Sequence, residues 1–234
     1  ISAPKGPNYR ESVPAALGDK EGTEALLANM ARLEVCGQKG LLERFDSSIG
    51  AATVLMPLAG TYQLTPEEAM VAKVPVRNDQ TDDATAMSYG YIPGVAKYSP
   101  FMGAAYAVVE SLSKLAAVGA DPLKARLTFQ EYFPRLHEDP ARWGQPTAAL
   151  LGALVAQTGM GLPAIGGKDS MSGSFEDLDV PPTLVSFALS MTKATRTLSA
   201  CVQHPGTRLV LLPVPEDGDG MPCWPRLKEL YTAV

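Results

Sequence analysis

The segment 165–174, Ile-Gly-Gly-Lys-Asp-Ser-Met-Ser-Gly-Ser, carries the residue types best suited to phosphate and metal chemistry. Its two glycines leave bare backbone that an anion can approach closely. Lys168 supplies a point charge for a phosphate group, and Asp169 supplies an oxygen ligand of the kind that Mg²⁺ prefers. Serine hydroxyls after Asp169 add hydrogen-bond donors. The pattern favours a phosphate-binding turn, with a plain polar turn between a strand and a loop as the alternative.

This segment differs from the P-loop of many nucleotide-binding proteins. In a P-loop a Ser or Thr follows the lysine directly, and another glycine stands five residues before the glycine of the Gly-Lys pair. Here Asp169 follows Lys168, and Leu162 occupies the earlier position. Any phosphate binding must therefore use a different arrangement of backbone, ammonium and carboxylate.

Glu110 is the second candidate, because it is a carboxylate in an otherwise apolar helical segment. An unpaired buried carboxylate is costly, so this one must be paired, bound to a metal or exposed to water. Lys114 lies four residues further on, in the favourable order for an ion pair, and a salt bridge is the plainer alternative. The acidic loop 78–83 is a third source of carboxylates, although such loops are more often simply solvated.

Periodic apolar patterns indicate the elements that must position these residues. The range 101–117 is the clearest helix, because it is apolar on most faces, follows a proline and ends before a glycine. The range 183–191 is the clearest strand. Further helices are expected at 23–33, 67–73 and 147–158, and further strands at 51–58, 126–129, 163–165 and 208–212. Such a mixture indicates an α+β or layered α/β fold.

The bulk composition is that of a globular protein and argues against several classes. The chain has 234 residues, of which 46% are hydrophobic and 19% charged, and its net charge is −5. Basic residues form no stripe with aromatics, so we expect no nucleic-acid partner. No apolar run is long enough to cross a membrane, and three cysteines without a CxxC spacing argue against a disulfide framework or a zinc site. We expect a cytoplasmic protein, and both ends look like cuts in a longer chain.

Three segments together resemble one enzyme family. They are 43–57 (ERFDSSIGAATVLMP), 125–133 (ARLTFQEYF) and 163–187 (PAIGGKDSMSGSFEDLDVPPTLVSF). They are similar to phosphoribosylformylglycinamidine synthase, the ATP-dependent amidotransferase of de novo purine synthesis, in its long single-chain bacterial form. The likeness runs from about Leu33 to Leu212.

The resemblance implies a fold and partners. Residues 23–194 would form the N-terminal module of the second synthetase half, of the kind shared with aminoimidazole ribonucleotide synthetase (PurM), with a mixed sheet that forms half of a β-barrel. Residues 1–22 would be a linker or arm, and 195–234 the truncated start of the C-terminal module. The implied partners are the first synthetase half and the glutaminase domain of the same polypeptide. A homodimer of the isolated chain is also expected, since half a barrel leaves apolar edges exposed.

The resemblance also implies the ligands ATP or ADP and Mg²⁺. The metal would be bound by carboxylates, and the phosphates by the glycine turn and a lysine nearer the N-terminus. The implied residues are Asp169, Glu110 and Asp79 for the metal, and Gly167, Lys168, Ser170, Ser172 and Lys39 for the nucleotide. Lys114 stands where many relatives have an asparagine, so its ammonium would either replace a cation or pair with Glu110.

Members of this family convert formylglycinamide ribonucleotide, glutamine and ATP to formylglycinamidine ribonucleotide, glutamate, ADP and phosphate. Their catalytic histidine and their glutaminase cysteine belong to other parts of the enzyme. We therefore assign no catalytic residue to this chain and expect it to be inactive alone. The alternative is a scaffold module whose nucleotide site is degenerate or purely structural.

Overall fold

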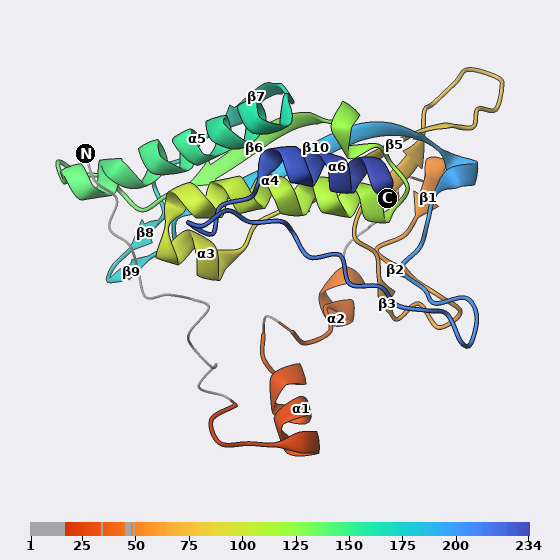
Figure 1. Cartoon of the computed structure of the whole chain (residues 1–234), viewed down its shortest axis with the longest axis horizontal. Helices are drawn as coiled ribbons and strands as arrows, with labels where there is room; N and C mark the ends of the chain where they lie inside the picture. Colours follow the sequence, from red (N-terminus) through yellow and green to blue (C-terminus); the bar gives the residue numbers. More distant parts are fainter. Residues whose placement is uncertain (1–16, 34, 45–47, 49) are drawn as a thin grey trace.

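The computed structural model describes residues 17–33, 35–44, 48 and 50–234. Its centre is a six-stranded sheet in the order β1-β4-β5-β10-β6-β7 (Figure 1). Neighbouring strands are antiparallel except β6 and β7, which are parallel, so the expected mixed sheet is confirmed. The strands are β1 (Thr53–Leu55), β4 (Met70–Lys73), β5 (Asp83–Gly90), β6 (Arg126–Tyr132), β7 (Ala164–Lys168) and β10 (Thr183–Lys193). Two small hairpins pair β2 (Leu58–Ala59) with β3 (Thr65–Pro66) and β8 (Ser174–Phe175) with β9 (Leu178–Asp179).

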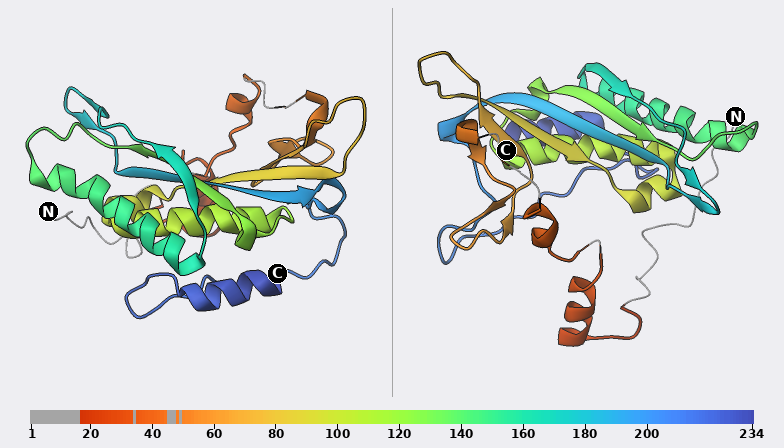
Figure 2. Two further views of the ribbon diagram at one scale, coloured as in Figure 1. Left: turned by 90° about the horizontal axis from the view of Figure 1, so that it is seen from above. Right: turned by 180° about the vertical axis from the view of Figure 1, so that it is seen from behind.

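Helices cover one face of this sheet (Figure 2). The helix α4 packs on β5 and β10, α5 packs on α4, and α6 packs on α5. The helices are α1 (Gly22–Met30), α2 (Lys39–Leu42), α3 (Pro93–Tyr98), α4 (Pro100–Ala117), α5 (Pro140–Met160) and α6 (Trp224–Ala233). Within the described ranges, no helix has the length and apolar character needed to span a membrane.

The long helix α4 forms where the sequence predicts a helix. The Ser99 hydroxyl accepts a hydrogen bond from the Met102 backbone N–H, and Pro100 occupies the first helical turn, which are both favourable at a helix start. The side chains of Leu112 and Leu115 are fully buried in one cluster with Leu127 of the sheet. Burying each such side chain contributes roughly 1.5–3 kcal/mol, so this contact anchors the helix layer to the sheet.

The central strand β10 is buried on one face and open on the other. Leu184 and Ala188 are buried against the helices, whereas Leu189 is 41% exposed and Met191 is 54% exposed. Tyr89 in the neighbouring strand β5 is 56% exposed and pairs with residue 187 of β10. We call the sheet surface formed by Met87, Tyr89, Phe187, Leu189 and Met191 the open face. It is an apolar surface that the described residues leave at least partly uncovered.

Two of the expected elements are wrong. The range 67–73 does not form a helix, because Met70–Lys73 is strand β4, whose pairing with β5 overrides the local helical pattern. The range 208–212 forms no strand, and Leu209 and Leu211 are each 88% exposed. A strand requires a neighbouring strand, and none in the described part of the chain reaches this segment.

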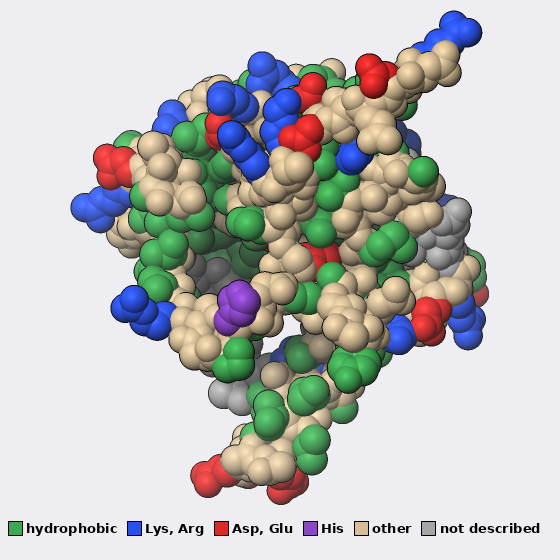
Figure 3. Space-filling model, turned by 90° about the vertical axis from the view of Figure 1, so that its right-hand side faces the viewer, with side chains coloured by type: hydrophobic (Ala, Val, Ile, Leu, Met, Phe, Trp, Pro, Cys, Tyr) green, Lys and Arg blue, Asp and Glu red, His purple; other side chains and the backbone are tan. Residues whose placement is uncertain are grey.

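On the side of the molecule that carries β1, β2 and β3, apolar side chains gather around a hollow (Figure 3).

The expected domain boundaries stay predictions. Residues 1–16 of the expected arm, and residues 45–47 and 49 of the first family-like segment, lie outside the described residues. At the other end, Leu227 and Tyr231 of α6 belong to the same core cluster as α4. The C-terminal segment therefore contributes apolar side chains to the core that α4 and the sheet share.

Candidate functional site

The expected strand at 163–165 extends to Lys168, so the glycines and Lys168 lie at the end of β7, and the loop begins at Asp169. We call this strand end and the loop after it the glycine turn. A Cβ atom on Gly167 would lie 2.7 Å from the Phe129 carbonyl oxygen, so only glycine allows β7 to approach β6 this closely. The turn is then fixed by backbone hydrogen bonds: the Ser170 N–H donates to the Glu131 carbonyl at 3.1 Å, and the Phe133 N–H donates to the Ser170 carbonyl at 2.9 Å. The sequence around the glycines thus produces a pinned loop.

The polar groups of this loop face solvent. Lys168 and Asp169 are exposed, and among the described residues neither side chain makes a hydrogen bond or an ion pair. The Ser170 and Ser172 hydroxyl oxygens lie 2.9 Å apart. The end of β7 and the loop after it therefore present bare backbone, an ammonium, a carboxylate and two hydroxyls near one edge of the sheet, as the sequence predicts. Their roles as nucleotide and metal ligands stay predictions.

Glu131 is the residue of this region that the sequence did not identify. Its side chain is only 5% exposed, and its Oε1 has no hydrogen-bond partner in the described part of the chain. Burial, followed by the negative charge of Asp169, raises the pKa of Glu131 from 4.5 to about 7. The sequence signal was weak: a carboxylate in a strand-like segment whose alternate residues, Leu127 and Phe129, are apolar.

Glu110 has both carboxylate oxygens engaged by the protein. Its Oε2 accepts a hydrogen bond from the Tyr91 N–H at 2.7 Å, and its Oε1 lies 3.0 Å from the Lys114 ammonium. The same ammonium lies 3.7 Å from Glu68 Oε2 and 4.4 Å from the centre of the Tyr89 ring. The salt bridge between Glu110 and Lys114 is therefore present, and Lys114 holds the position from which a cation would contact Glu110. A metal ligand role for Glu110 stays a prediction.

Glu110 and the glycine turn lie at different places on the sheet. A Cβ atom added to Gly90 would lie 2.9 Å from the Glu110 Cβ, so Glu110 sits beside the end of β5. Gly90 pairs with Ser186, which pairs with Phe129, which pairs with Gly167. Gly90 and Gly167 are therefore three strand spacings apart, which is about 14 Å. The structure does not bring Glu110 into contact with the turn.

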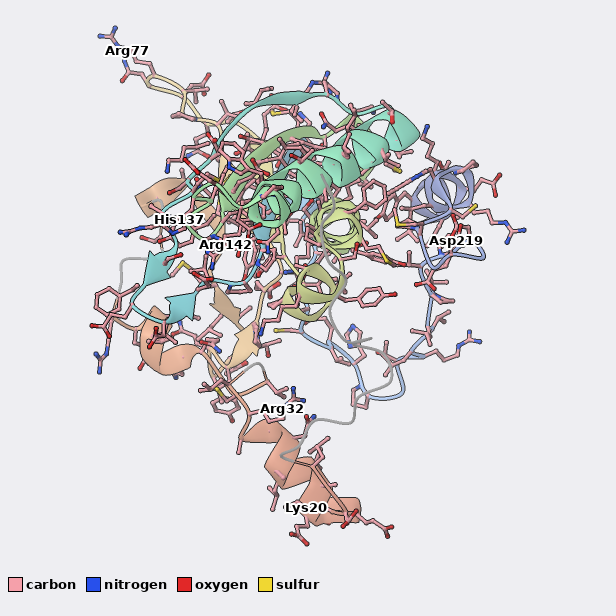
Figure 4. The ribbon with its side chains drawn as sticks, turned by 90° about the vertical axis from the view of Figure 1, so that its left-hand side faces the viewer. Lys20, Arg32, Arg77, His137, Arg142 and Asp219 are labelled. Atoms are coloured by element: carbon pink, nitrogen blue, oxygen red, sulfur yellow. The ribbon has the colours of Figure 1, made fainter. Side chains whose placement is uncertain are left out.

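Asp79 and Lys39 lie elsewhere. Asp79 belongs to the loop between β4 and β5 that projects from the molecule, and Arg77 in the same loop marks its tip (Figure 4). The Asp79 Oδ1 accepts a hydrogen bond from the backbone N–H of Gln80, the next residue, at 2.7 Å. Lys39 is in α2 and lies 3.5 Å from Glu43, and α2 is well separated from β7 (Figure 1). Neither residue meets the glycine turn.

The base of this projecting loop is fixed by its other two carboxylates. Asp82 accepts hydrogen bonds from the Thr195 hydroxyl and backbone N–H, which lower the pKa of Asp82. Asp83 pairs with Lys193 across the β5–β10 ladder. These two acidic residues therefore have structural partners. In the ranges that the structure describes, no cluster of three His, Cys, Asp or Glu residues could hold a metal ion.

Comparisons with known proteins agree with the family resemblance. No family model matches the chain. It is 28% identical over 188 residues to "Phosphoribosylformylglycinamidine synthase subunit PurL" of Granulibacter bethesdensis, covering 80% of this chain and 24% of the relative. The protein of the same name from Parafrankia sp. is 27% identical, covering 92% of this chain and 27% of the relative. The chain thus spans about a quarter of the length of the curated relatives it matches.

Solved structures show the same fold. "Structure of PurLQS from Thermotoga maritima" matches with a TM-score of 0.56 and 21% identity, covering 71% of this chain and 25% of that one. "T. maritima PurL complexed with AMPPCP" also matches with a TM-score of 0.56, at 20% identity, covering 80% of this chain and 28% of that one. The similarity to phosphoribosylformylglycinamidine synthase that the three motifs indicate is confirmed. The relatives named here are described as a subunit, PurL, so a long single-chain form stays a prediction.

Proposed function

We propose that this chain, as a counterpart of about a quarter of phosphoribosylformylglycinamidine synthase subunit PurL, supplies a phosphate-binding site of that ATP-dependent ligase. The observation that carries the proposal is the glycine turn at the end of β7, where Lys168 and Asp169 are exposed and have no hydrogen-bond or ion-pair partner among the described residues. Gly167 near the end of β7 and the hydroxyls of Ser170 and Ser172 in the loop after it belong to the same glycine turn. Together these groups suit the phosphates of ATP or ADP and an accompanying Mg²⁺.

The residues of the turn have distinct tasks in this proposal. The Lys168 ammonium neutralises phosphate charge, and the serine hydroxyls donate hydrogen bonds to phosphate oxygens. Asp169 contributes a carboxylate to the cation. Bound Mg²⁺ would supply charge stabilisation while phosphate activates the amide oxygen of formylglycinamide ribonucleotide for attack by ammonia. The whole reaction, including the conversion of glutamine to glutamate, requires parts of the enzyme beyond this chain.

The open face supports partners from the rest of such an enzyme. It is an apolar sheet surface, and exposed apolar surface of this kind is typical of interaction sites. We propose that the other synthetase half covers it, as expected for half of a β-barrel. A scaffold module with a purely structural nucleotide site is the second candidate. The observation that favours the scaffold is Lys114, whose ammonium already neutralises Glu110.

The phosphate site is tested by titrating the purified chain with ADP and Mg²⁺ by calorimetry. Lys168→Ala is expected to weaken ADP binding by about 10- to 100-fold, because charge-assisted hydrogen bonds contribute about 1.5–3 kcal/mol. Asp169→Asn is expected to weaken only the binding that depends on Mg²⁺. Lys97→Ala, which removes an exposed lysine of α3, is the matched control and should bind ADP like the parent. If Lys168→Ala binds ADP like the parent, the turn is not the phosphate site.

The open face also leads to a prediction about the self-association of the isolated chain. We expect the isolated chain to self-associate, because its exposed apolar sheet surface is removed from water on pairing. Sedimentation velocity should show a dimer at micromolar concentration, and Met191→Lys should shift it to monomer. Phe175→Lys changes an apolar residue of the β8–β9 hairpin that is even more exposed than Met191, and it should leave the dimer intact. A parent chain that stays monomeric at high concentration would contradict this use of the open face.

A further inference from the structure

Glu131 is a buried carboxylate to which the fold supplies no donor for one oxygen. The side chain is 5% exposed, and in the described ranges its Oε1 lacks a hydrogen-bond partner. It lies on the helix-covered side of the sheet, because it pairs with Leu184, which is 3% exposed. Buried polar atoms are nearly always paired, so this oxygen indicates a proton or a cation that completes the site.

The glycine turn brings a second carboxylate to the same place. Because the Ser170 N–H donates to the Glu131 carbonyl at 3.1 Å, the backbone after β7 runs along the end of β6. Lys168 pairs with Gln130 in the parallel ladder, and the hydrogen bonds of Ser170 continue that register, so Asp169 lies beside Glu131. Two neighbouring carboxylates repel each other when both are ionised. A bound cation would remove this repulsion.

Lys168 is not that cation. It pairs with Gln130 in the parallel ladder, and Gln130 and Glu131 are consecutive residues of one strand, whose side chains point to opposite faces of the sheet. Lys168 therefore leaves the strand on the face away from Glu131. No ion pair joins it to either carboxylate among the described residues. Among the described residues, no basic side chain forms an ion pair with Glu131 or Asp169.

We propose that Glu131 and Asp169 together bind the divalent cation that accompanies the nucleotide phosphates. This inference rests on the proposed function and adds to it a ligand, Glu131, that the family resemblance did not imply. Mg²⁺ at phosphate sites is commonly held by one or two carboxylates plus phosphate oxygens, which is the set that this pair and a bound nucleotide provide. Glu131 is held by β6 and Asp169 by the hydrogen bonds of the pinned turn, so both ligands stand on fixed backbone.

The experiment counts bound Mn²⁺ by electron paramagnetic resonance, as a substitute for Mg²⁺, on the chain saturated with ADP. The parent is expected to bind one Mn²⁺ per ADP. Glu131→Gln, which keeps the size of the side chain and removes its charge, should weaken Mn²⁺ binding at least about tenfold. Glu138→Gln removes an exposed carboxylate and serves as the control that should bind Mn²⁺ like the parent.

The outcomes separate this inference from the proposed function. If Asp169→Asn loses Mn²⁺ but Glu131→Gln binds it like the parent, Glu131 is not a ligand and the phosphate site stands. If the parent binds ADP but no Mn²⁺, the cation site is refuted and the nucleotide site stands. If the parent binds neither, both fail. A melting temperature of Glu131→Gln at or above that of the parent excludes misfolding as the cause of a loss.

Discussion

Replacing Glu131 by glutamine is expected to raise the free energy of unfolding at pH 8, without divalent cations, by up to about 3 kcal/mol. Burial first, and the charge of Asp169 second, raise the pKa of Glu131 from 4.5 to about 7 in the folded protein. Each pKa unit corresponds to about 1.4 kcal/mol. Glu131 is 5% exposed but lies near the end of β6 beside the exposed Asp169, so about 3 kcal/mol is the upper limit of this effect. The variant removes the buried charge and with it this penalty.

The pH dependence has a definite sign. Below pH 4.5 the carboxyl group is protonated in both the folded and the unfolded chain, so its charge does not lower the free energy of unfolding. Between pH 4.5 and about 7 the unfolded chain releases the proton while the folded chain retains it, so the contribution of Glu131 to stability falls as the pH rises. Above about pH 7 the full penalty is present.

Urea denaturation at pH 5 and at pH 8, in the presence of a chelator, measures this dependence. The stability difference between Glu131→Gln and the parent should be large at pH 8 and small at pH 5. Glu138→Gln, at an exposed position, should match the parent at both values. Equal stabilities of Glu131→Gln and the parent at pH 8 would contradict the burial of an ionisable, unpaired carboxylate. If Glu131 binds a cation, added Mn²⁺ and ADP should stabilise the parent more than the variant.

Gly90→Ala is expected to destabilise the fold by about 3 kcal/mol, because it overpacks the contact between β5 and α4. The new Cβ atom would lie 2.1 Å from the Ala107 carbonyl oxygen and 2.7 Å from the Ser111 nitrogen. Both are backbone atoms of α4, so relief requires the whole helix to shift. Because α4 also packs on β10, such a shift disturbs the centre of the sheet.

Thermal unfolding followed by circular dichroism checks this prediction. A loss of 3 kcal/mol lowers the melting temperature of a chain of this size by roughly 6–12 °C. Gly218→Ala is the control, because its Cβ would meet no atom within 4 Å, and it should change stability by less than about 0.5 kcal/mol. Equal melting temperatures for the two variants would show that β5 and α4 are not packed this closely.

The sequence predicted the parts of the fold that local patterns control. The helix α4 and the strand β10 appear at the expected positions, because their apolar patterns are long and the flanking proline and glycine mark the ends of the helix. The helix expected at 147–158 begins earlier, at Pro140, because Asp139 caps it: its side chain accepts a hydrogen bond from the Ala141 N–H. Local chemistry explains this extension once the cap is recognised.

What the sequence did not predict depends on pairing between distant segments. Whether Glu131 is buried or exposed follows from the register of β6 against β10, and a shift of one residue would turn its side chain to the other face. The pairing of β4 with β5 likewise overrode the helical pattern at 67–73. The glycine turn was identified because its residue types are informative wherever they occur. The contact between that turn and Glu131 could be seen only in the folded structure, because it depends on the pairing of β6 with β7.

The position of β10 between β5 and β6 also determines how the chain can fold. Lys193 pairs with Asp83, and Thr183 pairs with Tyr132, so one late segment completes two ladders with strands made much earlier. During synthesis, the edges of β5 and β6 that face β10 therefore stay unpaired until β10 has emerged from the ribosome. Such long-range closures slow folding and expose strands that can aggregate, so nascent forms of this protein should depend on chaperones.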